Sequence, residues 1–244
     1  AQREDCTAAL QGAFDHAAAM PRPSGALATV VVPPLSRGDN WTIAGVPAGG
    51  QWHGIRLNSS HSNMTVELQH GVVLEAKRGS FVPTYAPFLQ LFNVSRLRIT
   101  GYGSLITMQR ADYNDSRKGY AHSEDRHGIS LNNAEDIELL GLTVTETGGD
   151  GIILCTPKTR MGVGPKRVTI KDCRLDSNYR YEDRFWVPVV WSSQPGLTLG
   201  GAGCRTGREC PSSELSTYGL RTRRSRTQGK ATLAPLRVSA HRLN

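Results

Sequence analysis

The chain has 244 residues, of which 38% are hydrophobic and 26 are glycine, and its formal net charge is +8 at pH 7. This composition favours a turn-rich β protein, of one large domain or one domain plus a tail, over a helical one. It excludes a membrane-spanning helix, because no apolar run approaches the roughly 20 residues that a bilayer requires.

The first predicted element is a helix that begins with Asp5 or Thr7 as its N-cap and ends at about Met20. Its apolar stripe follows the i, i+3, i+4, i+7 spacing and consists of Leu10, Ala13, Phe14 and Ala17. A strand over residues 29–32 follows and stops at Pro33. We expect the helix to cap the end of the fold, because the terminal unit of a repeat exposes apolar interior and backbone edges.

Four units then repeat one pattern of three short strands in which apolar and polar residues alternate. The first strands of the units begin at Ile55, Leu89, Ile129 and Ile152. The second strands cover 64–68, 97–99, 137–139 and 168–170, and the third cover 72–74, 105–106, 142–144 and 173–175. Strands of period two that recur three to a unit are typical of a coiled stack of parallel strands. The sequence therefore predicts a parallel β-helix, a solenoid of about four to six coils.

The spacing of the units supports this prediction. Subtraction of the residue numbers of the four equivalent positions gives steps of 34, 40 and 23 residues. The shortest step fits one bare coil, and the longer ones carry insertions at about 76–86 and 108–126, which we expect on one face, often the binding face. The alternative is an antiparallel sandwich, which needs Asn-Gly or Asp-Gly hairpin turns. The one such dipeptide, Asp150-Gly151, lies where a strand starts.

Net charge divides the chain at about Asn178. Residues 179–244 hold 11 Lys and Arg against 4 Asp and Glu, whereas residues 1–178 hold 18 against 17. The charged run 180–184 stands where a fifth first strand should start, and the repeat does not continue. We therefore expect a β-helix domain over 1–178 and a basic, largely irregular tail over 179–244. The arginine-rich stretch 221–226 is expected to be solvated chain, because no nucleic-acid-binding motif accompanies it.

Cysteine and asparagine patterns bear on the cellular compartment. The five cysteines form no CxxC pair, which argues against a zinc ribbon; they are Cys6, Cys155, Cys173, Cys204 and Cys210. We expect buried free thiols at Cys155 and Cys173, while Cys204 and Cys210 could close a small loop in an oxidising compartment. Five asparagines lie in N-x-Ser/Thr sequons and indicate a secreted glycoprotein; they are Asn40, Asn58, Asn63, Asn93 and Asn114.

The repeat register also predicts a column of residues placed just before the four first strands, namely His53, Pro87, His127 and Asp150. Neighbouring coils lie about 4.8 Å apart, so His127 and Asp150 are expected within contact range. An imidazole beside a carboxylate can act as an acid/base pair. Asp125 or Glu146 could supply the second carboxylate that an inverting glycosidase needs at about 6.5–9.5 Å. The structural alternative is that Asp150 satisfies turn amides and His127 bonds its neighbour in the stack.

Two stretches resemble the right-handed parallel β-helix proteins of the pectate lyase superfamily. One is 5–11 followed by 30–34, which is similar to that superfamily's opening helix and first strand, and the other is 141–144 followed by 148–152. The resemblance covers about residues 5–178. Within the superfamily, the nearest enzymatic pattern is that of polygalacturonase-like glycoside hydrolases. Gly149-Asp150-Gly151 and Arg126-His127-Gly128 partly match its Gly-Asp-Asp and Gly-His-Gly motifs, and later coils are missing, as in a truncated relative.

The resemblance implies a right-handed, all-β solenoid that hydrolyses glycosidic bonds of a pectin-like polysaccharide. The candidate catalytic residues are Asp150, His127, Asp125 and Glu146, and the candidate substrate-binding residues are His53, Trp52, Tyr113 and Tyr120. Three alternatives stay open: a calcium-dependent lyase that would use the acidic group at 112–115, a polysaccharide-binding module without turnover, and an inactive relative. We expect a secreted monomer with a polysaccharide as its partner, and neither a cofactor, a metal, a specific nucleic acid nor a membrane.

Overall fold

The structure, a computed structural model, describes residues 4–48, 51–155, 164–178 and 198–200. The protein is mostly β with few helices. The helical elements of the described residues are α1 (Thr7–Ala19), α2 (Arg110–Tyr113) and the 3-10 helices η1 (Ser36–Gly38), η2 (Ser59–His61) and η3 (Ser116–Lys118). Within these ranges, no helix is both long enough and apolar enough to cross a bilayer.

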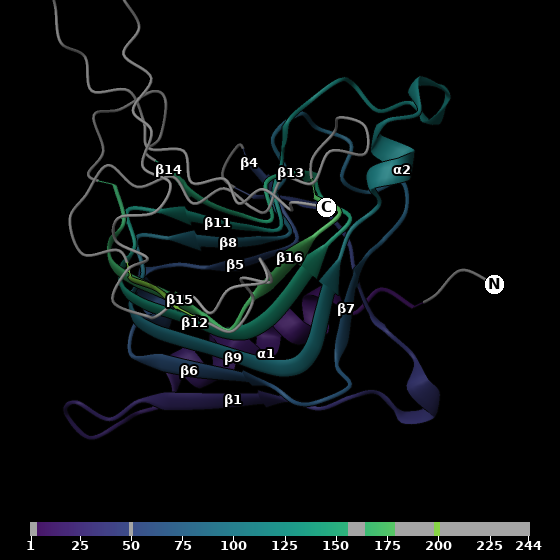
Figure 1. Ribbon diagram of the computed structural model, residues 1–244. Coiled ribbons are helices and arrows are strands. Elements are labelled where there is room, and N and C mark those ends of the chain that lie inside the picture. The colour runs from purple at the N-terminus through teal and green to yellow at the C-terminus, as the bar shows by residue number, and fades with distance from the viewer. Residues whose placement is uncertain (1–3, 49–50, 156–163, 179–197, 201–244) are drawn as a thin grey trace, which may run out of the picture.

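The larger sheet has nine strands, and the pairings between them are parallel. Its main path runs through β1 (Ala28–Val32), β6 (Met64–Leu68), β9 (Ser95–Thr107), β12 (Glu135–Thr145), β15 (Lys166–Lys171) and β17 (Thr198–Gly200). Three more strands join beside this path, namely β2 (Trp41–Ile43), β7 (Val73–Ala76) and β16 (Arg174–Asp176). Figure 1 shows β9 and β12 bending upward at one end, so that the sheet curls into a wall beside β7.

The bend in the long strands has a local cause. The first part of β9 pairs with β6 and its last residues pair with β7, so one strand serves two segments of the sheet. In β12 the register shifts between Leu140 and Leu142, around Gly141. Gly141 has a φ of 67°, in the left-handed region that glycine adopts without steric cost. The bend in β12 therefore lies at a glycine, which adopts the required backbone conformation without strain.

The smaller parallel sheet has four strands in the order β14 (Ile152–Cys155), β11 (Ile129–Asn132), β8 (Leu89–Phe92) and β5 (Ile55–Leu57). It lies above the larger sheet in Figure 1. Two short antiparallel pairs complete the strands, β3 (Val46–Ala48) with β4 (Gln51–His53), and β10 (Asp125–Arg126) with β13 (Gly148–Gly149). The chain alternates between the parallel sheets, because each strand of the smaller sheet precedes strands of the larger one.

The predicted register of the repeat is confirmed. In the smaller sheet Leu89 pairs with Ile55 and with Ile129, and Ile129 pairs with Ile152. The second and third strands are aligned in the same way: the paired columns are Met64, Leu97, Ile137 and Val168, and Leu74, Ile106, Val144 and Leu175. Alternation of apolar residues fixes this register, because a slip of one residue would turn every apolar side chain outward.

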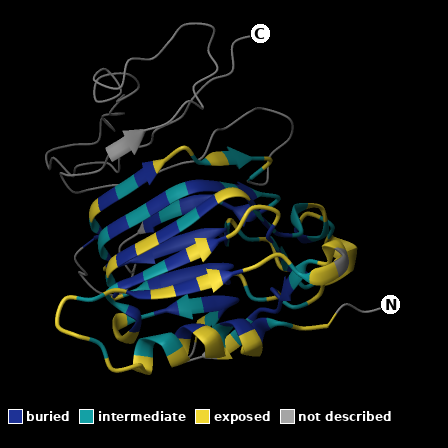
Figure 2. Ribbon diagram, turned by 90° about the horizontal axis from the view of Figure 1, so that it is seen from below, coloured by how far each residue is buried: buried dark blue, intermediate teal, exposed yellow. Residues whose placement is uncertain are grey.

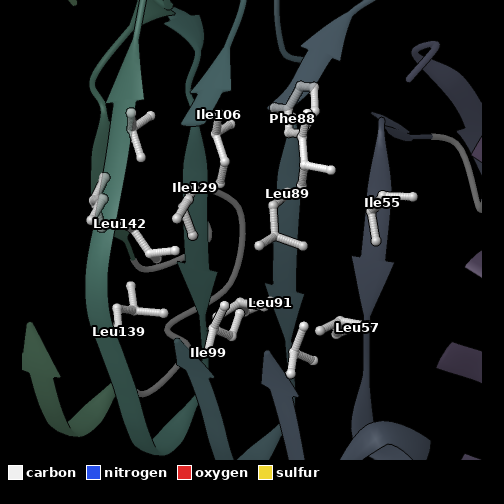
Figure 3. Packing of buried hydrophobic residues seen from close by; sticks show 14 of the residues in the cluster. Ile55, Leu57, Phe88, Leu89, Leu91, Ile99, Ile106, Ile129, Leu139 and Leu142 are labelled. Carbon is white, nitrogen blue, oxygen red and sulfur yellow. The ribbon is translucent and has the colours of Figure 1, made fainter. Parts of the chain in front are cut away.

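The core fills the space between the two sheets. Side chains from both sheets point into it, among them Ile55, Leu89, Ile99, Ile129 and Leu139 (Figure 3). These side chains are at most 8% exposed, and Ile129 and Leu139 are fully buried. Burial of each such side chain contributes about 1.5–3 kcal/mol. The large sheet is banded by burial in Figure 2, as strands of period two with one face on a core require.

Helix α1 lies against β1, η2 and β5, at the end of the fold where a cap is predicted. Leu10 and Phe14 are buried, whereas Ala13 is exposed, so the predicted stripe is wrong at that position. The buried face is centred on Leu10 and Phe14 with Thr7 one turn earlier, and Ala13 lies outside this arc. The N-cap position is Cys6, not Asp5 or Thr7, although an Asp5 oxygen still accepts the backbone N–H of Thr7 at 2.9 Å.

One side chain of α1 satisfies the edge of the smaller sheet. The Gln11 amide donates to the carbonyl oxygen of Arg56 and accepts from the backbone N–H of Arg56, both at 2.9 Å. Arg56 lies in β5, the outermost strand of that sheet. Because an unpaired strand edge exposes backbone donors and acceptors, Gln11 supplies the pair of hydrogen bonds that another strand would otherwise make.

The predictions for the thiols and the tail are tested only in part. Cys6 and Cys173 are free among the described cysteines, and burial raises the pKa of the half-buried Cys173 thiol. The side chain of Cys155, as well as Cys204 and Cys210, lies outside the described residues. Residues 179–197 and 201–244 of the predicted tail also lie outside them. The three residues between these ranges form β17, which pairs with β15.

Candidate functional site

The predicted column before the first strands exists in the backbone. The Gly54 N–H donates to the Pro87 carbonyl oxygen at 3.0 Å, and the Phe88 N–H donates to that of His127 at 2.8 Å. The Gly128 N–H donates to the carbonyl oxygen of Asp150 at 2.9 Å. Adjacency of His127 and Asp150, predicted from the repeat, is therefore confirmed.

His127 lies between two carboxylates. Its Nδ1 atom is 3.6 Å from Oδ2 of Asp150, and its Nε2 atom is 3.6 Å from Oδ1 of Asp125. The His127 side chain is only 3% exposed, whereas those of Asp150 and Asp125 are 17% and 43% exposed. One buried ring thus connects two carboxylates that differ in their contact with solvent.

The hydrogen bonds of His127 define its tautomer. The backbone N–H of Asp150 donates to Nδ1 of His127 at 3.1 Å. An imidazole nitrogen that accepts a hydrogen bond carries no proton, so the neutral ring holds its proton on Nε2. That proton faces Asp125. The backbone amide of Asp150 thus fixes one side of the ring, while the Asp125 carboxylate lies at ion-pair distance, beyond hydrogen-bond range, on the other.

The antiparallel pair of β10 and β13 brings Asp125 to this place. Asp125 pairs with Gly149, and Arg126 pairs with Gly148. A Cβ atom on Gly149 would collide with the carbonyl oxygen of Glu124 and come within 2.9 Å of Nδ1 of His127. Glycine at 149 therefore permits the close approach of the strand to the ring. No hydrophobic period in the sequence signals this pair, because each strand has only two residues.

A polar row next to the ring was missed by the sequence analysis. The rings of Tyr85 and His127 meet edge to face, with their centroids 6.3 Å apart, and the Tyr85 hydroxyl lies 3.2 Å from Oγ of Ser130. Arg56, Gln90 and Ser130 occupy one register position across β5, β8 and β11. They alternate with the core residues and so belong to the opposite face of the smaller sheet. Their shared register position, one residue after the aligned apolar residues of the repeat, was the sequence signal that could have indicated this row.

The structure places the candidate residues Glu146, His53 and Trp52 in three different environments. Among the described residues, Asp125 and not Glu146 lies within ion-pair distance of His127, and Glu146 pairs with Arg110 at 3.6 Å. His53 is buried in the first position of the column, and burial together with the nearby Arg56 charge lowers its pKa to about 4. It is therefore neutral near pH 7. Trp52 is half-buried and packs against the core.

Tyr113 and Tyr120 lie inside the second insertion. Their ring centroids are 4.9 Å apart at an interplanar angle of 79°, and the residues are 5% and 8% exposed. Burial raises the pKa of both phenols. In this structure the two rings pack the insertion and do not face solvent, so we assign neither of them a contact with substrate.

The acidic group of the second insertion is paired with arginines. Asp115 accepts two hydrogen bonds from the Arg117 side chain at 2.9 Å each, and these bonds lower the pKa of Asp115 to about 2. Asp112 lies 3.8 Å from Arg78. Within the described ranges, no group of three or more His, Cys, Asp or Glu side chains is arranged to hold a metal ion.

Comparisons with known proteins give one weak likeness. No protein-family model matches the chain, and no curated protein matches it. A crystal structure of a "putative glycosyl hydrolase" from Parabacteroides merdae is similar over 81% of this chain and 90% of that one, with 13% identity and a TM-score of 0.48. A likeness at this level establishes neither the family nor the activity of this chain.

Proposed function

We propose that the protein is a glycoside hydrolase that cleaves a pectin-like polysaccharide with Asp125 and Asp150, which flank His127. The observation that carries the proposal is the position of this one buried ring, 3.6 Å from each carboxylate. Two carboxyl groups near one another are the common requirement of glycosidic hydrolysis. The pair lies beside the insertions, the side where a solenoid commonly binds its ligands.

We propose a right-handed parallel β-helix over residues 1–178 as the scaffold of this site. Its support is the chain's alternation between two parallel sheets and the register of the three strand columns. Connections between parallel strands are right-handed in about 98% of cases, which favours that hand here. Such a scaffold holds the column rigidly, because each position is fixed by backbone hydrogen bonds to the next.

We propose that the two carboxylates act with inversion of the anomeric centre. They contact opposite nitrogens of one imidazole, so one ring and two contacts lie between them. Inverting enzymes hold their two carboxyl groups about 6.5–9.5 Å apart, which leaves room for a water. We assign proton donation to Asp150, the less exposed of the two carboxyl groups. The more exposed Asp125, which faces the Nε2 proton of His127, then activates the water.

An acidic polysaccharide accords with the polar row. Arg56 stands in the row, its guanidinium group 4.7 Å from the centroid of the Phe92 ring. A guanidinium group binds carboxylates in bidentate fashion, and an aromatic ring can stack on a sugar face. We therefore propose that a uronate-containing chain contacts Arg56 and Phe92, at the half-buried end of this row. Gln90 and Ser130 are 1% and 0% exposed, so we assign them no contact with substrate.

Secretion remains part of the proposal, since the polymeric substrates concerned are extracellular. Two of the five sequon asparagines, Asn93 and Asn114, are exposed. Asn58 caps η2 with its side chain, and Asn40 donates to Glu75. Attached glycans would therefore fit best at Asn93 and Asn114.

Release of reducing sugar from polygalacturonate and from neutral polysaccharides tests the function. We expect turnover by the native chain and a loss of about 10²- to 10⁴-fold in Asp150→Asn and Asp125→Asn. Asp39→Asn, which changes an exposed carboxylate elsewhere, should keep full activity. Unsaturated products that absorb in the ultraviolet would instead identify a lyase. Binding on a glycan array without turnover would identify a binding module, and unchanged activity of Asp150→Asn would refute the site.

A further inference from the structure

Among the residues that the structure describes, Arg126 is the largest fully buried side chain, at 0% exposure, and it stands between Asp125 and His127 in the sequence. Sequence analysis assigned it no role. A buried cation is costly unless its environment replaces the lost hydration. The groups around the Arg126 side chain must therefore compensate for the water that it has lost.

The guanidinium group is held by backbone oxygens of both insertions. Its Nε atom donates to the carbonyl oxygen of Phe81 at 2.8 Å. Its Nη2 atom donates to the carbonyl oxygens of Val82 at 2.8 Å and Ala121 at 3.1 Å. Phe81 and Val82 belong to the first insertion and Ala121 to the second. One side chain thus joins two loops that are about 40 residues apart in sequence.

Two tyrosine rings complete the environment of this cation. The Arg126 guanidinium carbon lies 5.2 Å from the ring centroid of Tyr113 and 5.3 Å from that of Tyr120. These are distances at which cation–π attraction operates, and it is stronger where water is excluded. The Tyr120 hydroxyl also accepts the backbone N–H of Gly79 at 2.8 Å. The tyrosines that looked like candidates for sugar stacking therefore enclose Arg126.

We propose that Arg126 is a positioning residue that holds β10 so that the Asp125 carboxylate faces Nε2 of His127. Its two neighbours in the chain provide the carboxylate and the ring, and β10 pairs with β13 just before Asp150. With the guanidinium group fixed to three carbonyl oxygens, the peptide units on either side of Arg126 have little freedom to move. The catalytic meaning of this role rests on the proposed function, but the geometric role does not.

Lysine should not replace Arg126 in this role. The three acceptors are reached by two different nitrogens of a planar group, and a lysine has a single nitrogen at the end of a flexible stem. Arg126→Lys therefore keeps the buried positive charge and loses the fork. Arg117→Lys is the matched control, because Arg117 lies in the same insertion and its side chain is 87% exposed.

The test uses nuclear magnetic resonance of the full chain labelled at histidine, with the His127 signal assigned from a His127→Gln variant. Asp125→Asn should shift the Nε2 resonance of His127 in the native background, because it changes the group that faces that proton. We expect the shift caused by Asp125→Asn to fall by at least about half in the Arg126→Lys background. It should persist in the Arg117→Lys background, because only residues that are energetically coupled change each other's effects. An equal shift in Arg126→Lys, even in a less stable protein, would overturn the proposal.

Tyr120→Leu provides a second route if Arg126→Lys does not fold. It removes one ring beside the guanidinium group together with the acceptor of the Gly79 N–H, and it leaves the hydrogen-bond donors of Arg126 in place. We expect a smaller loss of the Asp125-dependent shift, and an unchanged shift would count against the proposal. If the chain hydrolyses polysaccharide, Arg126→Lys should lower kcat about 10- to 100-fold with little change in KM. If it does not, the resonance shift still decides whether Arg126 positions Asp125.

Discussion

Charged side chains gather in two regions of this protein that differ in their contact with water. On the outer face of the large sheet, Arg98 pairs with Glu138 across neighbouring strands, and these side chains are 51% and 40% exposed. Between the two insertions, the Arg126 side chain is 0% exposed. Figure 2 shows the alternation of exposed and buried bands along the large sheet. Burial, rather than residue type, therefore decides which charges the fold depends on.

The largest effect on stability should come from His53, which is buried in the column of residues before the first strands. Its pKa in the folded protein is about 4, below the ordinary 6.5. The unfolded chain therefore takes up the proton first as the pH falls, and the folded state loses stability between about pH 6.5 and pH 4. At about 1.4 kcal/mol per pH unit, the loss reaches up to about 3 kcal/mol.

Urea unfolding at about pH 7 and about pH 4.5 measures this loss, and His53→Asn should remove most of the difference between the two conditions. His16→Asn is the matched control, because His16 is exposed in α1. A His53→Asn protein that keeps the full pH dependence would show that other groups cause it.

A glycine substitution beside His127 should have the next largest effect. Gly149→Ala places a Cβ against the Glu124 carbonyl oxygen, so β10 must shift. We expect a loss of about 1–3 kcal/mol in the free energy of unfolding. Gly12→Ala, in α1 with open space around the new methyl group, should instead stabilise the protein by up to about 1 kcal/mol. Thermal unfolding of the two variants gives the comparison, and equal signs would contradict it.

The smallest effect is expected on the outer face of the large sheet. Arg98→Gln breaks the ion pair with Glu138, which solvent already screens. The free energy of unfolding should fall by less than about 1 kcal/mol, because exposed pairs contribute little. The difference should vanish in about 1 M salt, where the Debye length is about 3 Å. A larger loss, or one that persists in salt, would place this pair with the buried charges.

Much of the strand arrangement could be predicted because period-two alternation is a local signal. The apolar residues that start each repeat, such as Ile129, must face the core, and this requirement sets both the strand and its register. The helix cap was predictable from Leu10 and Phe14, but Ala13 was not, because a small residue fits either face. The bends of β9 and β12 depend on how the coils pack, which the pattern of one strand does not contain.

The candidate site was predicted where it follows the repeat and missed where it depends on the insertions. The contact of His127 with Asp150 follows from the column, whereas Asp125 is brought there by a two-residue antiparallel pair. Tyr113 was a candidate for contact with substrate because an insertion has no period to indicate its inner side. Arg126 escaped notice for a related reason, since an isolated arginine in a charged loop usually lies in solvent.

The amide of Gln11 has a consequence for how the protein behaves at high concentration. A parallel stack has no inherent last layer, and any open rim can recruit another chain until a fibre forms. By occupying both backbone positions of Arg56, Gln11 closes that rim at the start of the smaller sheet. Gln11 thus leaves neither the N–H nor the carbonyl oxygen of Arg56 free to pair with a strand of another chain.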